Sequence, residues 1–275
     1  MDEHRATGQA DSLICIDTTA VAQTIEGLNL TINRMPVAAN DFSRDYYSYD
    51  EVAGDFELAR FIRHLGPEME KRGVEVYLGT IERADPALAD SILLDPEAGR
   101  YVKGCGFQWA GKDALPVLHE RYPDMPMMQT EQECGNGLNN WEGAMHSWEL
   151  MKHYFTHGVS VYDYWNISLL EGGVSRWGWS QNSLVTVDAE ARQHRFTPEA
   201  YLLKHASHYV QPGARLLKAA GNYADRLAFR NPDGRIVLLI ANQQAHEYPV
   251  MLQVGDWQAT ITLSPGSIRT VVIGG

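Results

Sequence analysis

Strand-type and helix-type segments alternate along most of this 275-residue chain, and the alternation constrains its fold more than any other feature. Apolar runs of strand length are each followed by a stretch in which apolar residues recur at helical spacing. The expected strands are 28–37, 74–81, 101–109, 126–130 and 159–165, and the expected helices are 56–72, 86–94, 114–121, 141–157 and 198–209. This pattern is typical of βα units around a parallel sheet. Within the first helix, Gly66-Pro67 predicts a break or a kink, and Gly73 predicts the end.

The chain changes character after about residue 211, where short strand-type runs are separated by turns. Turn residues such as Asn231-Pro232-Asp233-Gly234 and Pro265-Gly266 punctuate this part. The runs are 227–229, 236–241, 248–254, 259–263 and 267–273, and a similar run stands earlier at 13–17. The pattern predicts a small antiparallel sheet domain.

Composition and charge exclude several kinds of partner and site. The formal net charge of −12 repels nucleic-acid phosphates, so we expect no nucleic-acid partner. Cys15, Cys105 and Cys134 lack paired spacing, which argues against a disulfide framework or a zinc site. His153 and His157 lack the glutamate that the zincin motif needs, so we expect no metal. No stretch resembles a signal peptide and no apolar run could span a bilayer, so we expect a cytoplasmic protein without a membrane span.

Polar and aromatic side chains gather directly after the expected strands. They are Asn40, Asp41, Glu82, Trp109, Glu131, Trp165 and Asn166. In a (β/α) barrel the carboxyl ends of the strands meet at one face, and catalytic residues lie there. The sequence therefore predicts a site at this face.

Several segments carry a more specific resemblance. They are Gln23-Thr24-Ile25-Glu26-Gly27, Arg34-Met35-Pro36 with Asn40-Asp41-Phe42-Ser43, Tyr77-Leu78-Gly79-Thr80-Ile81-Glu82-Arg83, Gly106-Phe107-Gln108-Trp109, Gln129-Thr130-Glu131-Gln132-Glu133-Cys134-Gly135, Tyr162-Asp163-Tyr164-Trp165-Asn166 and the run from Glu171 to Trp179. Together they resemble glycoside hydrolase family 30, the glucosylceramidase-like retaining β-glycosidases. The resemblance covers nearly everything after residue 12, and it places these segments on the first, second and fifth to eighth barrel strands and the loop that follows.

The resemblance implies a role for each site residue. Glu131 occupies the position of the nucleophile, with Glu133 as the fallback. Arg34 resembles the arginine that orients the nucleophile, although a structural salt bridge is the alternative. Asp41 resembles an acceptor for sugar hydroxyls, against a loop-capping role.

Three further residues are implied in substrate binding. Trp109 and Trp165 resemble residues that hold the sugar, since an indole face binds the apolar C–H groups of a sugar, and packing in the core is the alternative. Asn166 suits a hydrogen bond to a hydroxyl group or to Glu131.

The sequence also departs from the family pattern. Gly27 runs directly into Leu28, where the rest of the first strand and its helix belong, and a second gap lies between Leu58 and Ala59. The third and fourth strands belong in that gap, with the Asn-Glu-Pro motif that carries the acid/base. No Asn-Glu-Pro occurs in this chain, so the acid/base is not identified, and Glu82 is a weak candidate.

The resulting prediction is an incomplete (β/α) TIM-type barrel over residues 27–210 and a β-sandwich formed by residues 11–26 with 211–275. The resemblance implies hydrolysis of β-glucosides or related β-glycosides, including glycolipids, through a glycosyl-enzyme intermediate without a cofactor. The alternatives are a catalytically inactive carbohydrate-binding protein and a truncated barrel that depends on assembly. Because an incomplete barrel exposes sheet edges, we expect a tendency to form a homo-oligomer.

Overall fold

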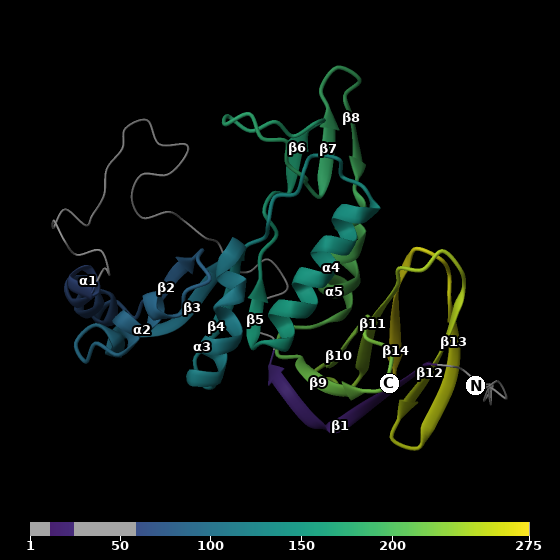
Figure 1. Ribbon diagram of the computed structural model, residues 1–275, viewed down its shortest axis with the longest axis horizontal. Coiled ribbons are helices and arrows are strands. Elements are labelled where there is room, and N and C mark those ends of the chain that lie inside the picture. The colour runs from purple at the N-terminus through teal and green to yellow at the C-terminus, as the bar shows by residue number, and fades with distance from the viewer. Residues whose placement is uncertain (1–11, 25–58, 275) are drawn as a thin grey trace. The chain divides into compact units, whose positions relative to one another are not determined.

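The computed structural model describes residues 12–24 and 59–274, and its elements are labelled in Figure 1. The chain divides into two compact units. One comprises Met1–Asn29, Cys134–Thr156 and Tyr164–Gly275, and the other comprises Leu30–Glu133 and His157–Asp163. Of the sequence predictions, the strand at 28–37 and residues Arg34 and Asp41 lie outside the described residues.

The second unit is built on a parallel sheet in the order β2-β3-β4-β5. The strands are β2 (Val76–Ile81), β3 (Val102–Gln108), β4 (Met127–Glu131) and β5 (Val159–Tyr162). All three pairings are parallel, with Ile81 opposite Phe107 and Gln108 opposite Glu131. The carboxyl ends of the strands therefore meet at one edge, as the alternating pattern predicts.

Three helices of this unit alternate with the strands. Helix α1 (Ala59–Lys71) precedes β2, α2 (Ala87–Leu93) lies between β2 and β3, and α3 (Leu115–Arg121) lies between β3 and β4. The predicted break or kink at Gly66-Pro67 is wrong as a break, because α1 continues through Pro67. Gly66 lies so close to the Tyr101 ring that a Cβ would stand 2.3 Å from Cγ of that ring, so this position of the helix has room only for glycine.

The first unit contains a seven-stranded sheet in the order β13-β12-β1-β9-β10-β11-β14. The strands are β1 (Ser12–Thr24), β9 (Arg215–Ala220), β10 (Arg226–Arg230), β11 (Ile236–Asn242), β12 (Tyr248–Val254), β13 (Trp257–Leu263) and β14 (Ser267–Ile273). Buried side chains from six of these strands, among them Ile14, Leu238 and Leu252, form one apolar cluster. The sheet therefore folds over a common core, as a sandwich does.

Strand β1 lies between two strands of the carboxyl-terminal part, parallel to β12 and antiparallel to β9. Ile14 pairs with Leu252, and Ile16 with both Val254 and Ala219. The run at 13–17 is thus one end of a longer strand that belongs to this sheet (Figure 1).

The first unit also holds two helices and a small sheet. The helices are α4 (Trp141–Thr156) and α5 (Pro198–Tyr209), and the strands are β6 (Ser168–Leu170), β7 (Val185–Asp188) and β8 (Gln193–Phe196). The small sheet was not predicted. The strand predicted at 159–165 ends at Tyr162, so Trp165 and Asn166 follow it in a loop instead of ending it.

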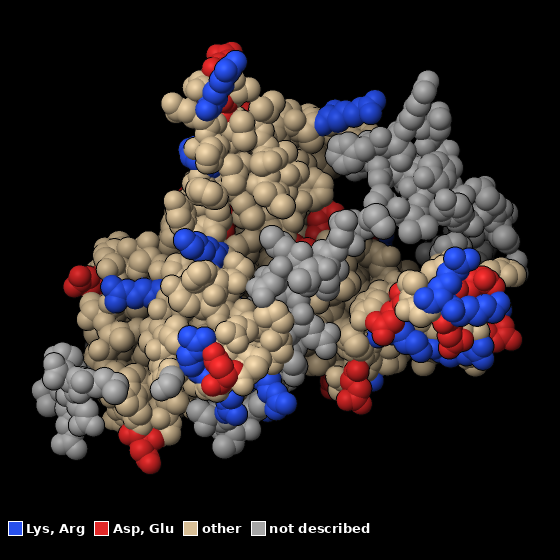
Figure 2. Space-filling view, turned by 180° about the vertical axis from the view of Figure 1, so that it is seen from behind, with Lys and Arg blue, Asp and Glu red and all other residues tan. Residues whose placement is uncertain are grey.

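Several charged side chains of the described residues form ion pairs at the surface. Where α1 lies, Figure 2 shows basic side chains interleaved with acidic ones. Arg63 pairs with Asp95 there, and Lys71 with Glu68 at 2.7 Å. Within the part of the chain that the structure describes, no helix combines the length and the apolar character needed to cross a membrane.

Candidate active site

Strand β4 carries Glu131 at its last position, and side chains of β4 fix this end by hydrogen bonds to the backbone on both sides. Thr130 donates its hydroxyl hydrogen to the Phe107 carbonyl of β3 at 3.2 Å. On the other side, the backbone N–H of Asp163, directly after β5, donates to Oε1 of Gln129 at 2.7 Å. The backbone at Glu131 is therefore held while its half-buried carboxylate stays accessible from the carboxyl edge of the sheet.

The next residue along, Gln132, is buried and strengthens the same anchorage. The phenol of Tyr162 donates to Oε1 of Gln132 at 2.7 Å. Both side chains are buried, so this hydrogen bond forms where water does not compete for the two groups. It ties the residue that follows Glu131 to the end of β5.

Trp109 contacts the carboxylate of Glu131 directly. It follows the last residue of β3, and its indole Nε1–H donates to Oε1 of Glu131 at 3.2 Å. The backbone of Trp109 has φ 47°, in the left-handed region that residues other than glycine seldom adopt. Strained backbone of this kind gathers at functional sites, because the surrounding contacts must hold it in place.

Glu133 is ion-paired beside this contact. Lys112 stands 2.9 Å from its carboxylate, and the same ammonium group donates to the Trp109 carbonyl at 3.2 Å. The side chains of Lys112 and Glu133 are 28% and 19% exposed, so the pair is partly shielded from water. Glu131 and Glu133 thus meet different partners, an indole N–H and an ammonium.

Glu82 follows β2 at the same edge of the sheet, and its carboxylate pairs with Arg83 at 3.2 Å. Its side chain is 52% exposed. One strand, β3, separates β2 from β4, which puts the axes of the two strands about 10 Å apart. Glu82 and Glu131 thus lie at the same edge of the sheet with one strand between them.

Trp165 and Asn166 belong to the other compact unit. The Trp165 indole donates to Oε1 of Gln181 at 3.3 Å, and the Asn166 carbonyl accepts from the backbone of Leu184 at 3.2 Å. Both residues are half-buried. Trp177 and Trp179, farther along the same loop region, are 64% and 61% exposed. These tryptophans are available to a ligand in a way that fully buried ones are not.

A buried carboxyl group lies between α4 and α5. Glu199, in the first turn of α5, is 2% exposed and accepts from the Ser147 hydroxyl at 2.9 Å. Burial raises the pKa of Glu199, and the hydrogen bond from Ser147 together with the polar neighbours Tyr164 and Asn182 opposes the rise in part. Burial together with the nearby Glu199 also raises the pKa of Tyr164. This group was not singled out from the sequence.

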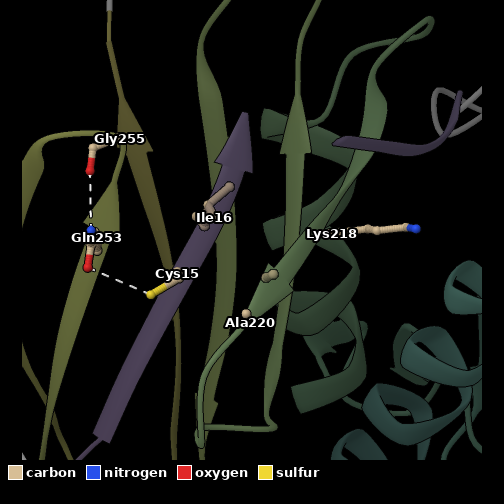
Figure 3. A pocket seen from close by; sticks show the side chains of 7 residues that line it. Cys15, Ile16, Lys218, Ala220, Gln253 and Gly255 are labelled. Atoms are coloured by element: carbon tan, nitrogen blue, oxygen red, sulfur yellow. Dashed lines mark hydrogen bonds between the residues drawn. The ribbon is translucent and has the colours of Figure 1, made fainter. Parts of the chain in front are cut away.

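A pocket of about 380 Å³ opens on the sandwich sheet and contains none of the predicted site residues. Figure 3 shows the Cys15 thiol directed toward Gln253, to which it donates at 3.7 Å, while the Lys218 side chain points away from the thiol. Small and aliphatic groups complete the lining. Such a lining offers few directed hydrogen-bonding groups for a sugar.

Two family models match the chain. The glycosyl hydrolase family 30 TIM-barrel domain matches residues 20–68, and the glycosyl hydrolase family 30 beta sandwich domain matches residues 218–271. The resemblance of this chain to glycoside hydrolase family 30 is thereby confirmed. The predicted fold class, a TIM-type barrel with a carboxyl-terminal β-sandwich, is confirmed with it.

Curated proteins that are similar to this chain include glucosylceramidases. It is 27% identical to the lysosomal acid glucosylceramidase of Mus musculus, over 76% of this chain and 44% of the relative. It is 26% identical to putative glucosylceramidase 4 of Caenorhabditis elegans, over 91% of this chain and 53% of the relative. The chain thus spans about half the length of the curated relatives it matches.

Solved structures share the fold. The crystal structure of SrfJ from Salmonella typhimurium has a TM-score of 0.67 and 24% identity, over 78% of this chain and 52% of the other. An endo-beta1,6-glucanase has a TM-score of 0.68 and 19% identity, over 77% and 52%.

The structure places Trp109 and Glu131, two of the predicted site residues, within hydrogen-bonding distance of each other. Lys112 was missed. The pattern that could have found it is a lysine three residues after a tryptophan at a strand end, since a basic residue within one turn of a carboxylate site can pair with it.

Proposed function

We propose that this family 30 chain is a retaining glycosidase that cleaves β-glucosides or related β-glycosides, with Glu131 as the nucleophile. The observation that carries the proposal is the hydrogen bond from the Trp109 indole to the Glu131 carboxylate at the carboxyl edge of the parallel sheet. The family membership and the glucosylceramidase names of the curated relatives support the substrate class.

The chemistry follows from the carboxylate. One oxygen of Glu131 attacks the anomeric carbon, the bond to the leaving oxygen breaks, and a glycosyl ester forms on the enzyme. Water then attacks the same carbon and releases Glu131. A hydrogen bond to the second carboxylate oxygen orients the attacking group, and the indole of Trp109 is placed to donate one.

Departure of an ordinary alcohol requires a proton from a general acid, and general acid–base catalysis contributes about 10²–10⁴ in rate. The absent Asn-Glu-Pro motif leaves that role without a family residue. We therefore propose that glycosides with a good leaving group are cleaved most readily, because such groups depart without protonation.

The test is hydrolysis of 2,4-dinitrophenyl β-glucoside by the wild-type chain and by Glu131→Ala, each with and without azide. We expect turnover that azide accelerates and that Glu131→Ala abolishes, because azide attacks the glycosyl-enzyme without a general base. Glu82→Gln is the matched control and should leave this turnover in place.

Other outcomes would point elsewhere. Fast turnover that azide does not change would mean that a further carboxylate supplies the acid/base. If the folded protein binds glucosides without cleaving them, the proposed hydrolysis is wrong and the chain is a carbohydrate-binding protein. A concentration-dependent size without sugar binding would favour a barrel that depends on assembly.

A further inference from the structure

The backbone at Trp109 needs external support. With φ at 47°, a residue with a Cβ occupies the left-handed region at a cost in free energy. Trp109 also begins the short 3-10 helix Trp109–Asp113, so its conformation sets the direction of the chain as it leaves β3. Whatever holds this turn also determines where the indole points.

Two contacts hold the turn. Gly111 is packed so tightly on β2 that a Cβ there would lie 1.9 Å from the Ile81 carbonyl oxygen. Lys112 donates to the Trp109 carbonyl at 3.2 Å, and its ammonium stands 2.9 Å from the Glu133 carboxylate. Glu133 in turn is two residues beyond the candidate nucleophile, so Lys112 connects the turn after β3 to the chain after β4.

These contacts and the backbone between Glu131 and Glu133 form a ring. Glu131 binds the indole of Trp109, the carbonyl of the same tryptophan binds Lys112, and Lys112 pairs with Glu133. The pair between Lys112 and Glu133 is partly shielded, which makes its hydrogen bonds stronger than those of an exposed pair.

We propose that Lys112 is a positioning residue for the Glu131 carboxylate. By binding the Trp109 carbonyl and Glu133 together, its ammonium keeps the left-handed turn in place and holds the indole N–H on Glu131. The expected effect on turnover rests on the proposed function, whereas the expected effect on the indole does not.

The first measurement observes the indole directly. Protein labelled with ¹⁵N-tryptophan gives one Nε1–H signal for each indole, and Trp109→Phe identifies the signal of Trp109. We expect Lys112→Met to shift this signal and to speed its exchange with water, and Lys112→Arg to restore it in part. Lys71→Met, which removes an exposed ion-paired lysine on α1, is the matched control and should leave the signal unchanged.

The second measurement is turnover of 2,4-dinitrophenyl β-glucoside. Misplacement of a reacting group by about 1 Å can cost on the order of 10²-fold in rate, so we expect a loss of that order in kcat for Lys112→Met. KM should change little, because Lys112 acts on the nucleophile and not on the sugar. Lys112→Arg should recover most of the loss.

The two measurements separate the proposals. If the wild-type chain cleaves nothing, the proposed function fails and the indole signal still decides the role of Lys112. An indole signal and a kcat that Lys112→Met leaves at wild-type values would overturn the positioning role. Should Lys112→Met not fold, Glu133→Gln weakens the same link, and an unchanged indole signal in that variant would overturn the proposal as well.

Discussion

Trp109 shows how much of this site depends on single residues. Its indole donates a hydrogen bond to Glu131, and its main-chain carbonyl accepts one from Lys112. One residue thus takes part in two of the contacts around the carboxylate. Both are possible only because β3 ends at Gln108 and the chain turns at once. A residue that holds two partners through different groups tolerates few substitutions.

Replacement of Trp109 by phenylalanine keeps an aromatic ring but removes the indole N–H. A hydrogen bond to a charged group contributes about 1.5–3 kcal/mol, so we expect turnover of an activated β-glucoside to fall by roughly 10- to 100-fold. Steady-state kinetics on the purified variant measure this. Trp257→Phe, at a tryptophan that is 45% exposed on β13, is the control and should stay close to wild type. Full activity in Trp109→Phe would remove the indole from the mechanism.

The site role of a residue could be predicted from the sequence where the residue stands in a recognisable motif, and not where it stands outside one. Glu131 stands in a seven-residue segment with a family resemblance, and its place at the end of a strand could be predicted. Lys112 is one of 23 basic residues, and its role depends on a turn geometry that no periodicity encodes. The role of Arg34 in orienting the nucleophile and the roles of Asp41, Trp165 and Asn166 in binding the sugar remain predictions.

Among the elements, those with clear boundary residues were predicted best. The start of α5 follows from Thr197-Pro198, since the Thr197 hydroxyl accepts from the Ala200 N–H and proline suits the first turn. The small sheet was missed because β6 has three residues and every residue of β8 is exposed, which leaves no alternation to detect. The strand β9 was missed because Arg215–Ala220 has a composition that also suits a helix.

The contact between α4 and α5 makes stability depend on pH. Burial raises the pKa of Glu199 above 4.5, so the folded state binds this proton more tightly than the unfolded state does. The stabilisation of the folded state by Glu199 is therefore fully present below pH 4.5 and is lost as the pH rises through the raised pKa of this residue. Burial lowers the pKa of His205, so the stabilisation of the folded state by this residue increases as the pH rises.

Glu199→Gln keeps the neutral form of the side chain at every pH. We expect its Tm to decline less than that of the wild-type chain as the pH is raised from 4.5, and thermal unfolding monitored by circular dichroism measures both curves. The contribution of His205 is present in both proteins and cancels in the difference. Glu142→Gln, on the exposed side of α4, controls for the loss of one carboxylate. Parallel curves for wild type and Glu199→Gln would contradict the expected linkage.

For the whole molecule, most of the described apolar core could be predicted because its strands alternate or are continuously apolar. Strand β11 is buried at all seven positions, and the sequence identifies it as a strand between turn signals. What could not be predicted is which strands become neighbours. The order of the seven-stranded sheet places β1 between β12 and β9, and this depends on long-range pairing that local patterns do not specify.

Leu238 is fully buried at the centre of this core, and its truncation should destabilise the protein. We expect Leu238→Ala to lower the free energy of unfolding by about 2–5 kcal/mol, because it removes buried methyl groups and leaves a cavity. Urea denaturation measures the change. Val272→Ala, on the adjacent strand β14 and 41% exposed, should cost well under 1 kcal/mol, roughly the range of surface substitutions. Equal effects for the two variants would contradict the assignment of the core.

The position of β1 has a consequence for the growing chain on the ribosome. Cys15 and Gln253, which meet across β1 and β12, are 238 positions apart. At about 5–20 residues per second, translation separates the emergence of these two segments by roughly 10 to 50 seconds. During that interval the apolar residues of β1 lack their partner strands, while the ribosome synthesises the parallel sheet. A nascent chain of this protein is therefore a natural client for chaperones that shield hydrophobic segments until synthesis of β12 is complete.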